Sequence, residues 1–199
     1  MLPLEFGHQP TWILPRLRSG DPDADRLYTA VGKALSQWEE LETGLGELFA
    51  TFVESRSIAA ARAYGTMASA QGRFDLLDAA AEVYFVDREG RDDYRPIIKA
   101  LRLASPCRNN IAHGAVREYA AHGVDGGGFY LVSPEYNSRR NEPFADLERD
   151  SVDPFDFARH KYAYSTDQIN ELSERFALLA REVGNFARRV ARPRALPAS

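Results

Sequence analysis

The sequence predicts a mainly α-helical protein, an antiparallel bundle of about four long helices with a β-hairpin and long-loop excursion before the last helix. Two apolar stripes support this prediction, because each repeats at alternating spacings of three and four residues, as the buried face of a helix does. One stripe lies near the start of the chain and the other near its end. Between them, residues 115–165 are rich in glycine and polar residues and lack a sustained period, which predicts the excursion.

Residues 1–22 are predicted to form an irregular N-terminal arm, because prolines interrupt them repeatedly. The first long helix is expected over residues 23–54, where Gly44 and Gly46 would allow a neighbouring helix to approach closely. Glu42 lies at the edge of its apolar face. We favour a solvated position for it over the alternative, a polar pocket at the core edge. The stripe consists of Leu27, Val31, Ala34, Trp38, Leu41, Leu45, Leu48 and Phe52.

A second helix is expected over residues 57–86, either continuous or broken near Gly65 or Gly72. Ser69 and Arg73 lie four residues apart in this helix and could line a site, but surface hydrogen bonding is the default interpretation of both. The apolar stripe of this segment consists of Ala70, Phe74, Leu77, Ala81 and Tyr84.

A third helix starts in the last two residues of a charged turn at residues 87–93. Two interpretations are open where it reaches Ser105 and Pro106. Pro106 kinks one helix that continues to His113, or Ser105 caps a new helix with Pro106 at its first position. We favour the kinked continuation, because one heptad phase is kept by Ile97, Leu101, Ala104 and Ile111.

The excursion has three predicted parts. Residues 116–119 and 129–132 flank a glycine-rich segment and are expected to pair as a β-hairpin. Residues 134–160 are polar and without period, which is typical of a long surface loop. Residues 162–164 are expected to add a short strand that pairs with the excursion.

The last helix has a sharp predicted start, because Ser165 at the N-cap and Gln168 three residues later form a capping box. It is expected to end near Arg192, before a C-terminal tail at residues 193–199. Residues 23–192 are therefore predicted to form a single helical domain. The stripe of the last helix consists of Ile169, Leu172, Phe176, Leu179, Val183, Phe186 and Val190.

Composition limits the function and the compartment. The formal net charge of −4 argues against a protein held on nucleic acid by a broad basic surface, although a local basic site remains compatible with it. The single Cys107 cannot form an internal disulfide, and we interpret it as a buried, inert thiol. No apolar run approaches the ~18 residues of a membrane span, and the start lacks the pattern of a signal peptide. We expect a cytoplasmic protein that does not enter a membrane.

The segment RNNIAHG, residues 108–114, places an arginine, an asparagine and a histidine together. On a helix Arg108 and His113 lie roughly 140° apart, whereas Asn109 and His113 form an i,i+4 pair on one face. A histidine can transfer a proton near neutral pH, and an arginine can hold a phosphodiester and stabilise the added charge of its transition state. Gly114 is expected to stop the helix.

This segment resembles the Arg-x4-His signature of the HEPN superfamily, including the asparagine after the arginine. HEPN domains are small α-helical domains, and many are metal-independent ribonucleases. The resemblance implies a HEPN-like domain in which Arg108, Asn109 and His113 are catalytic and RNA is the substrate. It implies attack by the RNA 2′-hydroxyl without a metal or cofactor, and a homodimer with a composite site. Ala115 stands where some HEPN toxins have a tyrosine, so control by modification of that tyrosine is not expected.

Several functional hypotheses remain open. The leading one is an intracellular endoribonuclease of the toxin, phage-defence or stress-response type, although the sequence indicates no antitoxin partner. The alternative is a non-catalytic HEPN-like module that binds RNA, a nucleotide or a protein, and the acidic net charge favours it. A structural helical dimer without a ligand is the third. Within the motif, the alternative to catalysis is a helix end where Asn109 and His113 only satisfy the local backbone.

Overall fold

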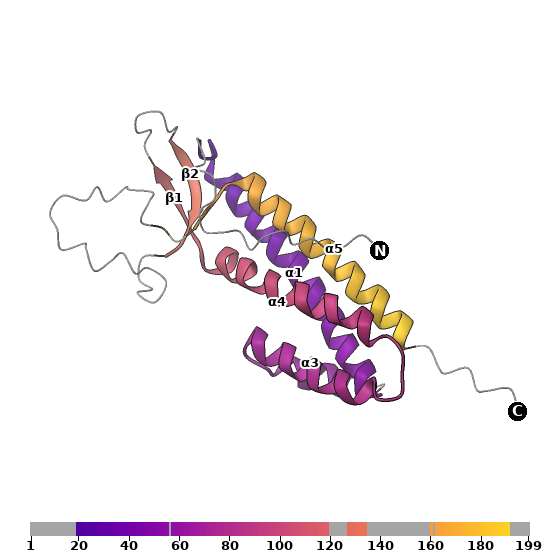
Figure 1. The fold of residues 1–199 in the computed structure, drawn as a ribbon. Helices are drawn as coiled ribbons and strands as arrows, with labels where there is room; N and C mark the ends of the chain where they lie inside the picture. The colour runs from indigo at the N-terminus through magenta and orange to yellow at the C-terminus, as the bar shows by residue number, and fades with distance from the viewer. Residues whose placement is uncertain (1–18, 56, 120–126, 135–159, 161, 192–199) are drawn as a thin grey trace, which may run out of the picture. The chain divides into compact units, whose positions relative to one another are not determined.

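Five α-helices and a three-stranded sheet make up the part of the chain that the structure describes, which confirms a mainly α fold (Figure 1). The computed structural model describes residues 19–55, 57–119, 127–134, 160 and 162–191. In chain order the elements are α1 (Ala24–Phe52), α2 (Ile58–Gly65), α3 (Ala70–Tyr84), α4 (Arg91–His113), β1 (Ala115–Tyr119), β2 (Gly128–Val132), β3 (Ala163–Tyr164) and α5 (Thr166–Val190).

The described residues belong to two compact units. The first unit holds residues 37–105 and 175–191, apart from residue 56, and the second holds the described residues of 19–36 and 106–174. The boundaries fall inside α1, α4 and α5, so each of these helices contributes one part to each unit. The RNNIAHG segment lies in the second unit together with all three strands.

In the first unit, the apolar stripes of α1 and α5 are buried together, as predicted. The Trp38 ring packs edge-on against the Phe176 ring, with 5.2 Å between ring centroids. A methyl group added at Gly44 would lie 3.4 Å from Val183 Cγ1, which is an ordinary van der Waals contact, so the packing of α5 against α1 does not require a glycine at this position. The fully or almost fully buried apolar residues of these two helices in this unit are Trp38, Leu41, Leu45, Leu48, Phe52, Phe176, Leu179, Val183 and Phe186.

The segment predicted as a second helix, residues 57–86, forms two helices, with the break directly after Gly65. Each helix has its own serine N-cap. The Ser57 side chain accepts a hydrogen bond from a backbone N–H in the first turn of α2, and the Ser69 side chain does the same in α3. Because a serine at an N-cap satisfies backbone donors that have no partner within the helix, two caps favour two helix starts.

The third predicted helix, α4, is continuous from Arg91 through Pro106 to His113, which confirms the continuation that the heptad phase favoured. It begins one residue before the predicted start, directly after Gly90, whose φ of 114° suits a glycine. Because the helix does not restart at Pro106, the motif at its end keeps the rotational phase set by the apolar stripe further back.

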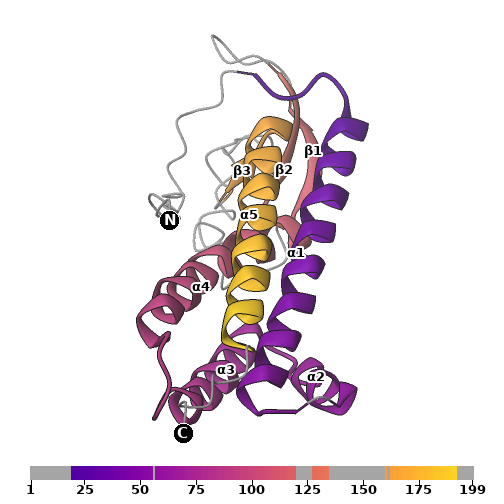
Figure 2. The ribbon, with the colours of Figure 1, turned by 90° about the vertical axis from the view of Figure 1, so that its right-hand side faces the viewer.

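The predicted hairpin and short strand are both present in the second unit, and Figure 2 shows the three strands. The strand order is β1-β2-β3, with antiparallel pairing throughout. Ala115 pairs with Val132 at the start of the hairpin, and Leu131 pairs with Tyr164 in β3. β1 directly follows the RNNIAHG segment, and β2 pairs with β1. β3 lies on the other side of β2, although it is distant in sequence.

The start of α5 is fixed by two sets of bonds. The predicted capping box is confirmed: Gln168 Oε1 accepts from the Ser165 N–H at 3.0 Å, and Ser165 Oγ accepts from the Gln168 N–H at 3.4 Å. The second set is a single bond, in which Asp21 Oδ2 accepts from the Thr166 N–H at 2.8 Å. The backbone of Asp21 also exchanges two hydrogen bonds with Phe129.

Asp21 was predicted to lie in an irregular arm, but it is anchored to the sheet and to α5. The rest of the predicted arm up to residue 18 lies outside the described residues. The predicted long loop lies outside them except for Pro134 and His160, and so does the predicted C-terminal tail.

Candidate functional site

The RNNIAHG segment forms the last turns of α4, and burial alternates sharply along it. Arg108 and Asn109 are half-buried, Asn110 and Ile111 are buried, and His113 is exposed. Ile111 keeps the apolar phase of the helix and fixes which side of the last turn faces the core. The three residues predicted to be catalytic are therefore all at least half-accessible, as are Ala112 and Gly114.

Arg108 and Asn109 are in direct contact. A guanidinium N–H of Arg108 donates to Asn109 Oδ1, with 3.3 Å between the heavy atoms. This bond ties the arginine to the amide of the next residue and leaves the Asn109 NH₂ group as a donor. The structure thus brings together two of the three predicted residues.

His113 is the last residue of α4 and makes no hydrogen bond or ion pair within the described part of the chain. Arg108 and His113 are therefore not bonded to each other within that part of the chain. The exposure of His113 leaves both ring nitrogens accessible to a ligand.

The competing interpretation, that Asn109 and His113 satisfy the local backbone, receives no support from the hydrogen bonds of the described residues. Asn109 accepts from a side chain, and His113 bonds to no backbone group. Asn110, which was not predicted to have a role, links the helix end to its surroundings.

Asn110 is only 7% exposed, and both its backbone and its side chain bond to β3 or its approach. The Tyr162 hydroxyl donates to the Asn110 carbonyl oxygen at 2.9 Å, and Asn110 Nδ2 donates to the Tyr164 hydroxyl oxygen at 3.2 Å. Burial raises the pKa of Tyr164, so this hydroxyl keeps its proton well above neutral pH. The only sequence signal was the position of Asn110 next to Ile111, on the buried side of the predicted helix.

Gly114 ends α4, as predicted, but for a different reason than a left-handed cap. It does not have the positive φ of such a cap. A Cβ at this position would lie 2.6 Å from Leu131 Cγ and 3.1 Å from the Asn110 carbonyl oxygen. The absence of a side chain therefore allows the chain to pass close to β2 as it leaves the helix.

A second histidine of this unit, His160, makes contacts that were not predicted. His160 Nδ1 lies 3.0 Å from the Ser133 carbonyl oxygen, and His160 Nε2 bonds to the Tyr119 hydroxyl. Because a carbonyl can only accept, Nδ1 carries a hydrogen, and in the neutral ring Nε2 accepts from Tyr119. Both ring nitrogens are therefore used in holding β1 and β2 to the segment before β3.

Glu42 and Arg73 in the first unit form a half-buried ion pair, in which 11% of the Glu42 side chain and 27% of the Arg73 side chain are exposed. Arg73 NH1 lies 2.9 Å from Glu42 Oε2, and Trp38 Nε1 donates to Glu42 Oε1 at 3.0 Å. The polar pocket at the core edge was thus the right interpretation of Glu42, and the favoured solvated face was wrong. The hydrogen bond from the Trp38 indole N–H offsets part of the free-energy cost of removing the Glu42 carboxylate from water.

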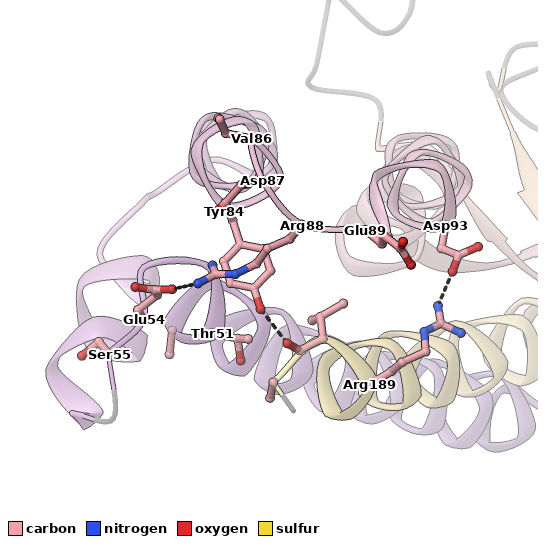
Figure 3. A pocket seen from close by; sticks show the side chains of 14 residues that line it. Thr51, Glu54, Ser55, Tyr84, Val86, Asp87, Arg88, Glu89, Asp93 and Arg189 are labelled. Carbon is pink, nitrogen blue, oxygen red and sulfur yellow. Dashed lines mark hydrogen bonds and ion pairs between the residues drawn. The ribbon is translucent and has the colours of Figure 1, made fainter. Parts of the chain in front are cut away.

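A hollow in the first unit has a volume of ≈ 1110 Å³. Figure 3 shows the side chains that line it. Its wall is formed by the end of α1, the turn between α3 and α4, and the end of α5. Arg88 pairs with Glu54, and Arg189 NH2 lies 2.9 Å from Asp93 Oδ2. Both arginines in the wall are thus neutralised by carboxylates, and the RNNIAHG segment belongs to the other unit.

Other features of the described residues bear on the predicted class of protein. Cys107 is buried, in agreement with the inert-thiol interpretation. Within the described ranges, no three His, Cys, Asp or Glu side chains are grouped so that they could hold a metal ion. None of the described helices is long and apolar enough to cross a membrane.

Comparison with known proteins gives no match to a family model, to a curated protein or to a solved structure.

Proposed function

We propose that the RNNIAHG segment is the active site of a HEPN-like, metal-independent endoribonuclease. The observation that supports this most directly is the pairing of Arg108 with Asn109 beside an exposed His113 at one helix end. A guanidinium oriented by a neighbouring amide can bind a phosphodiester through two parallel N–H groups. An imidazole that is exposed and free of local hydrogen bonds can exchange protons with an incoming substrate.

The proposed reaction uses the RNA itself as the nucleophile. The 2′-oxygen forms a bond to phosphorus while the bond from phosphorus to the 5′-oxygen breaks. The 2′-hydroxyl proton passes to His113 acting as a base, and an acid returns a proton to the 5′-oxygen. Arg108 stabilises the extra negative charge on the phosphoryl oxygens. The products are a 2′,3′-cyclic phosphate and a free 5′-hydroxyl, with no metal or cofactor in the reaction.

A homodimer would supply the acid that one site lacks. With two protomers, one His113 serves as the base and its counterpart as the acid, and two Arg108 side chains face one phosphodiester. We therefore propose a dimer that brings two RNNIAHG segments toward one cleft, acting in defence or as a toxin. Light scattering over micromolar concentrations tests this proposal, and a purely monomeric protein would remove the composite-site arrangement.

The direct test of the enzyme is incubation of purified protein with total RNA in EDTA, beside an Arg108→Ala/His113→Ala double variant. Cleavage by the wild type and not by the variant supports the proposal, provided that both proteins have the same melting temperature. End-group analysis should then find a 2′,3′-cyclic phosphate upstream of the break.

The alternative function is a non-catalytic HEPN-like module that binds RNA, a nucleotide or a protein. The observations that favour it are the net charge of −4 and the lack of an Arg108–His113 bond within the described residues. Identical RNA patterns from the wild type and the double variant, over varied RNA substrates, would select this alternative.

A further inference from the structure

Asn110 is the point at which the motif helix is fixed to the third strand. Its carbonyl accepts from Tyr162, and its side-chain amide donates to Tyr164, so one residue has two bonds to the same short segment. Both tyrosines are almost completely buried, and their rings stack with 5.4 Å between centroids and 29° between planes. The two hydroxyls therefore present a rigid pair of partners to the helix end.

The bond from Tyr162 has a specific role in helix geometry. The last four carbonyls of an α-helix lack a partner within the helix, and the ends of helices fray for that reason. Asn110 is the first of the last four residues of α4, which ends at His113. The Tyr162 hydroxyl supplies the missing donor at a carbonyl that is buried and cannot use water instead.

The bond to Tyr164 fixes rotation about the helix axis. Successive helical residues are turned by about 100°, so a fixed Asn110 side chain also fixes the directions of Arg108, Asn109 and His113. Asn110 lies between the half-buried Arg108–Asn109 pair and the exposed His113.

We infer that Asn110, through Tyr162 and Tyr164, is a positioning residue that holds the last turn of α4 so that Arg108, Asn109 and His113 keep one fixed arrangement. The inference rests on the proposed ribonuclease function for its catalytic consequence. Its structural consequence, an ordered helix end, is independent of that function. Displacement of catalytic groups by about 1 Å can lower a rate on the order of a hundredfold, so loss of one anchoring bond should be visible in kcat.

The test compares two tyrosine-to-phenylalanine variants that each remove one hydroxyl donor to a helix-end carbonyl. Tyr162→Phe removes the bond to Asn110. Tyr84→Phe is the matched control, because the Tyr84 hydroxyl donates at 2.5 Å to the carbonyl of Val190, the last residue of α5, in the first unit. The measurements are kcat and KM on a short oligoribonucleotide, melting temperature, and hydrogen exchange of the amides of residues 111–114.

We expect Tyr162→Phe to lower kcat by about tenfold or more with KM changed less than about twofold, and to speed exchange at residues 111–114. Tyr84→Phe should lower the melting temperature by a similar amount while leaving kcat and that exchange unchanged. Equal loss of kcat in both variants, or an unchanged kcat in Tyr162→Phe, would overturn the positioning role.

Two further outcomes keep the inference separate from the proposed function. If Tyr162→Phe does not fold, Tyr164→Phe removes only the side-chain partner of Asn110 and is judged by the same criteria. If wild-type protein cleaves no RNA, the proposed function fails, and hydrogen exchange alone decides on positioning. Unchanged exchange at residues 111–114 in the Tyr162 and Tyr164 variants would then overturn it.

Discussion

Arg108 and His113 differ in how the fold holds them, and this difference suggests different roles. Arg108 is half-buried and bonded to Asn109, so its guanidinium is held in place before any ligand arrives. His113 is exposed at the helix end and has no hydrogen bond in the described part of the chain. A held cation suits phosphate binding and charge stabilisation, whereas an accessible imidazole suits proton transfer.

His113→Ala is expected to abolish most cleavage while leaving RNA affinity and folding nearly unchanged. A general acid or base acts mainly in the transition state, and an exposed side chain contributes little to the core. Single-turnover cleavage, RNA binding by filter retention and melting temperature measure the three properties. If the variant unfolds while its folded fraction still cleaves RNA, His113 is a structural cap and the assignment of this site fails.

Arg108→Lys should lose most cleavage but retain part of the RNA affinity. Lysine keeps the positive charge, but it lacks the planar two-pronged donor and the bond geometry to Asn109. Asn109→Ala is the milder companion, because it removes only the group that orients the guanidinium. A cleavage rate in Arg108→Lys equal to that of the wild type would show that a simple charge is enough at this position.

The two adjacent asparagines of the motif differ in whether their contacts can be predicted from the sequence. The contact of Asn109 with Arg108 is local, and the helical spacing of the motif was enough to group these residues. The partners of Asn110 lie 52 and 54 positions further along the chain, one directly before β3 and one within it, and the register of that strand was not predicted. A buried polar residue of this kind is recognisable only when the topology has placed its partner.

At the scale of elements, the sequence predicted those features whose partners lie close along the chain. The capping box at Ser165 and Gln168 was correct because both partners lie within one turn. The break after Gly65 remained one of two alternatives, because a glycine weakens a helix by only about 1 kcal/mol and packing can override it. The bond that the Thr166 N–H donates to Asp21 at the start of α5 was missed, because it joins residues 145 positions apart.

Two glycine substitutions should have opposite effects on stability. Gly32→Ala in α1 has no atom within 4 Å of the new methyl group and should stabilise the protein by about 0.5–1 kcal/mol, the helix propensity difference. Gly114→Ala would place its methyl group 2.6 Å from Leu131 Cγ and should destabilise it by about 1–3 kcal/mol. Urea unfolding measures both. Gain of stability in Gly114→Ala would show that β2 can move away from the helix end.

At the scale of the whole molecule, the two predicted stripes are the main source of the buried core. Leu45 on α1 and Phe176 on α5 have no exposed surface. Their burial was predictable because apolar residues spaced by three and four positions over a long segment fall on one face of a helix and on both faces of a strand. The division into two units was not predictable, because the boundaries fall inside continuous helices whose sequence pattern does not change there.

Leu45→Asp or Phe176→Asp should destabilise the protein by more than about 3 kcal/mol, since each buries an unpaired charge. Leu178→Asp is the matched control on α5, because that side chain is 43% exposed. It should cost less than about 1 kcal/mol. Denaturant unfolding gives the three values, and losses below about 1 kcal/mol at both core positions would mean that the buried faces are assigned wrongly.

Alkaline pH should destabilise the protein through its buried tyrosines. Burial is the largest cause that raises the pKa of Tyr64, Tyr94 and Tyr164. The hydrogen bond from Tyr94 to Asp78 raises the pKa of Tyr94 further. In the unfolded chain a tyrosine loses its proton near pH 10, so above that pH the folded state binds more protons than the unfolded state. The stability that these groups contribute is fully present below about pH 10 and is lost as the pH rises further.

Each such tyrosine should lower the free energy of unfolding by about 1.4 kcal/mol per pH unit above pH 10, as long as it stays neutral in the folded state. Urea unfolding between pH 9 and 11, with tyrosinate absorbance followed in parallel, measures this slope. Tyr164→Phe should reduce this slope by the contribution of one tyrosine. Tyr28→Phe changes a side chain that is 59% exposed and should leave the slope unchanged. Ionisation of all the tyrosines near pH 10 in the native protein would contradict the burial of Tyr164 and, with it, the anchor that holds Asn110.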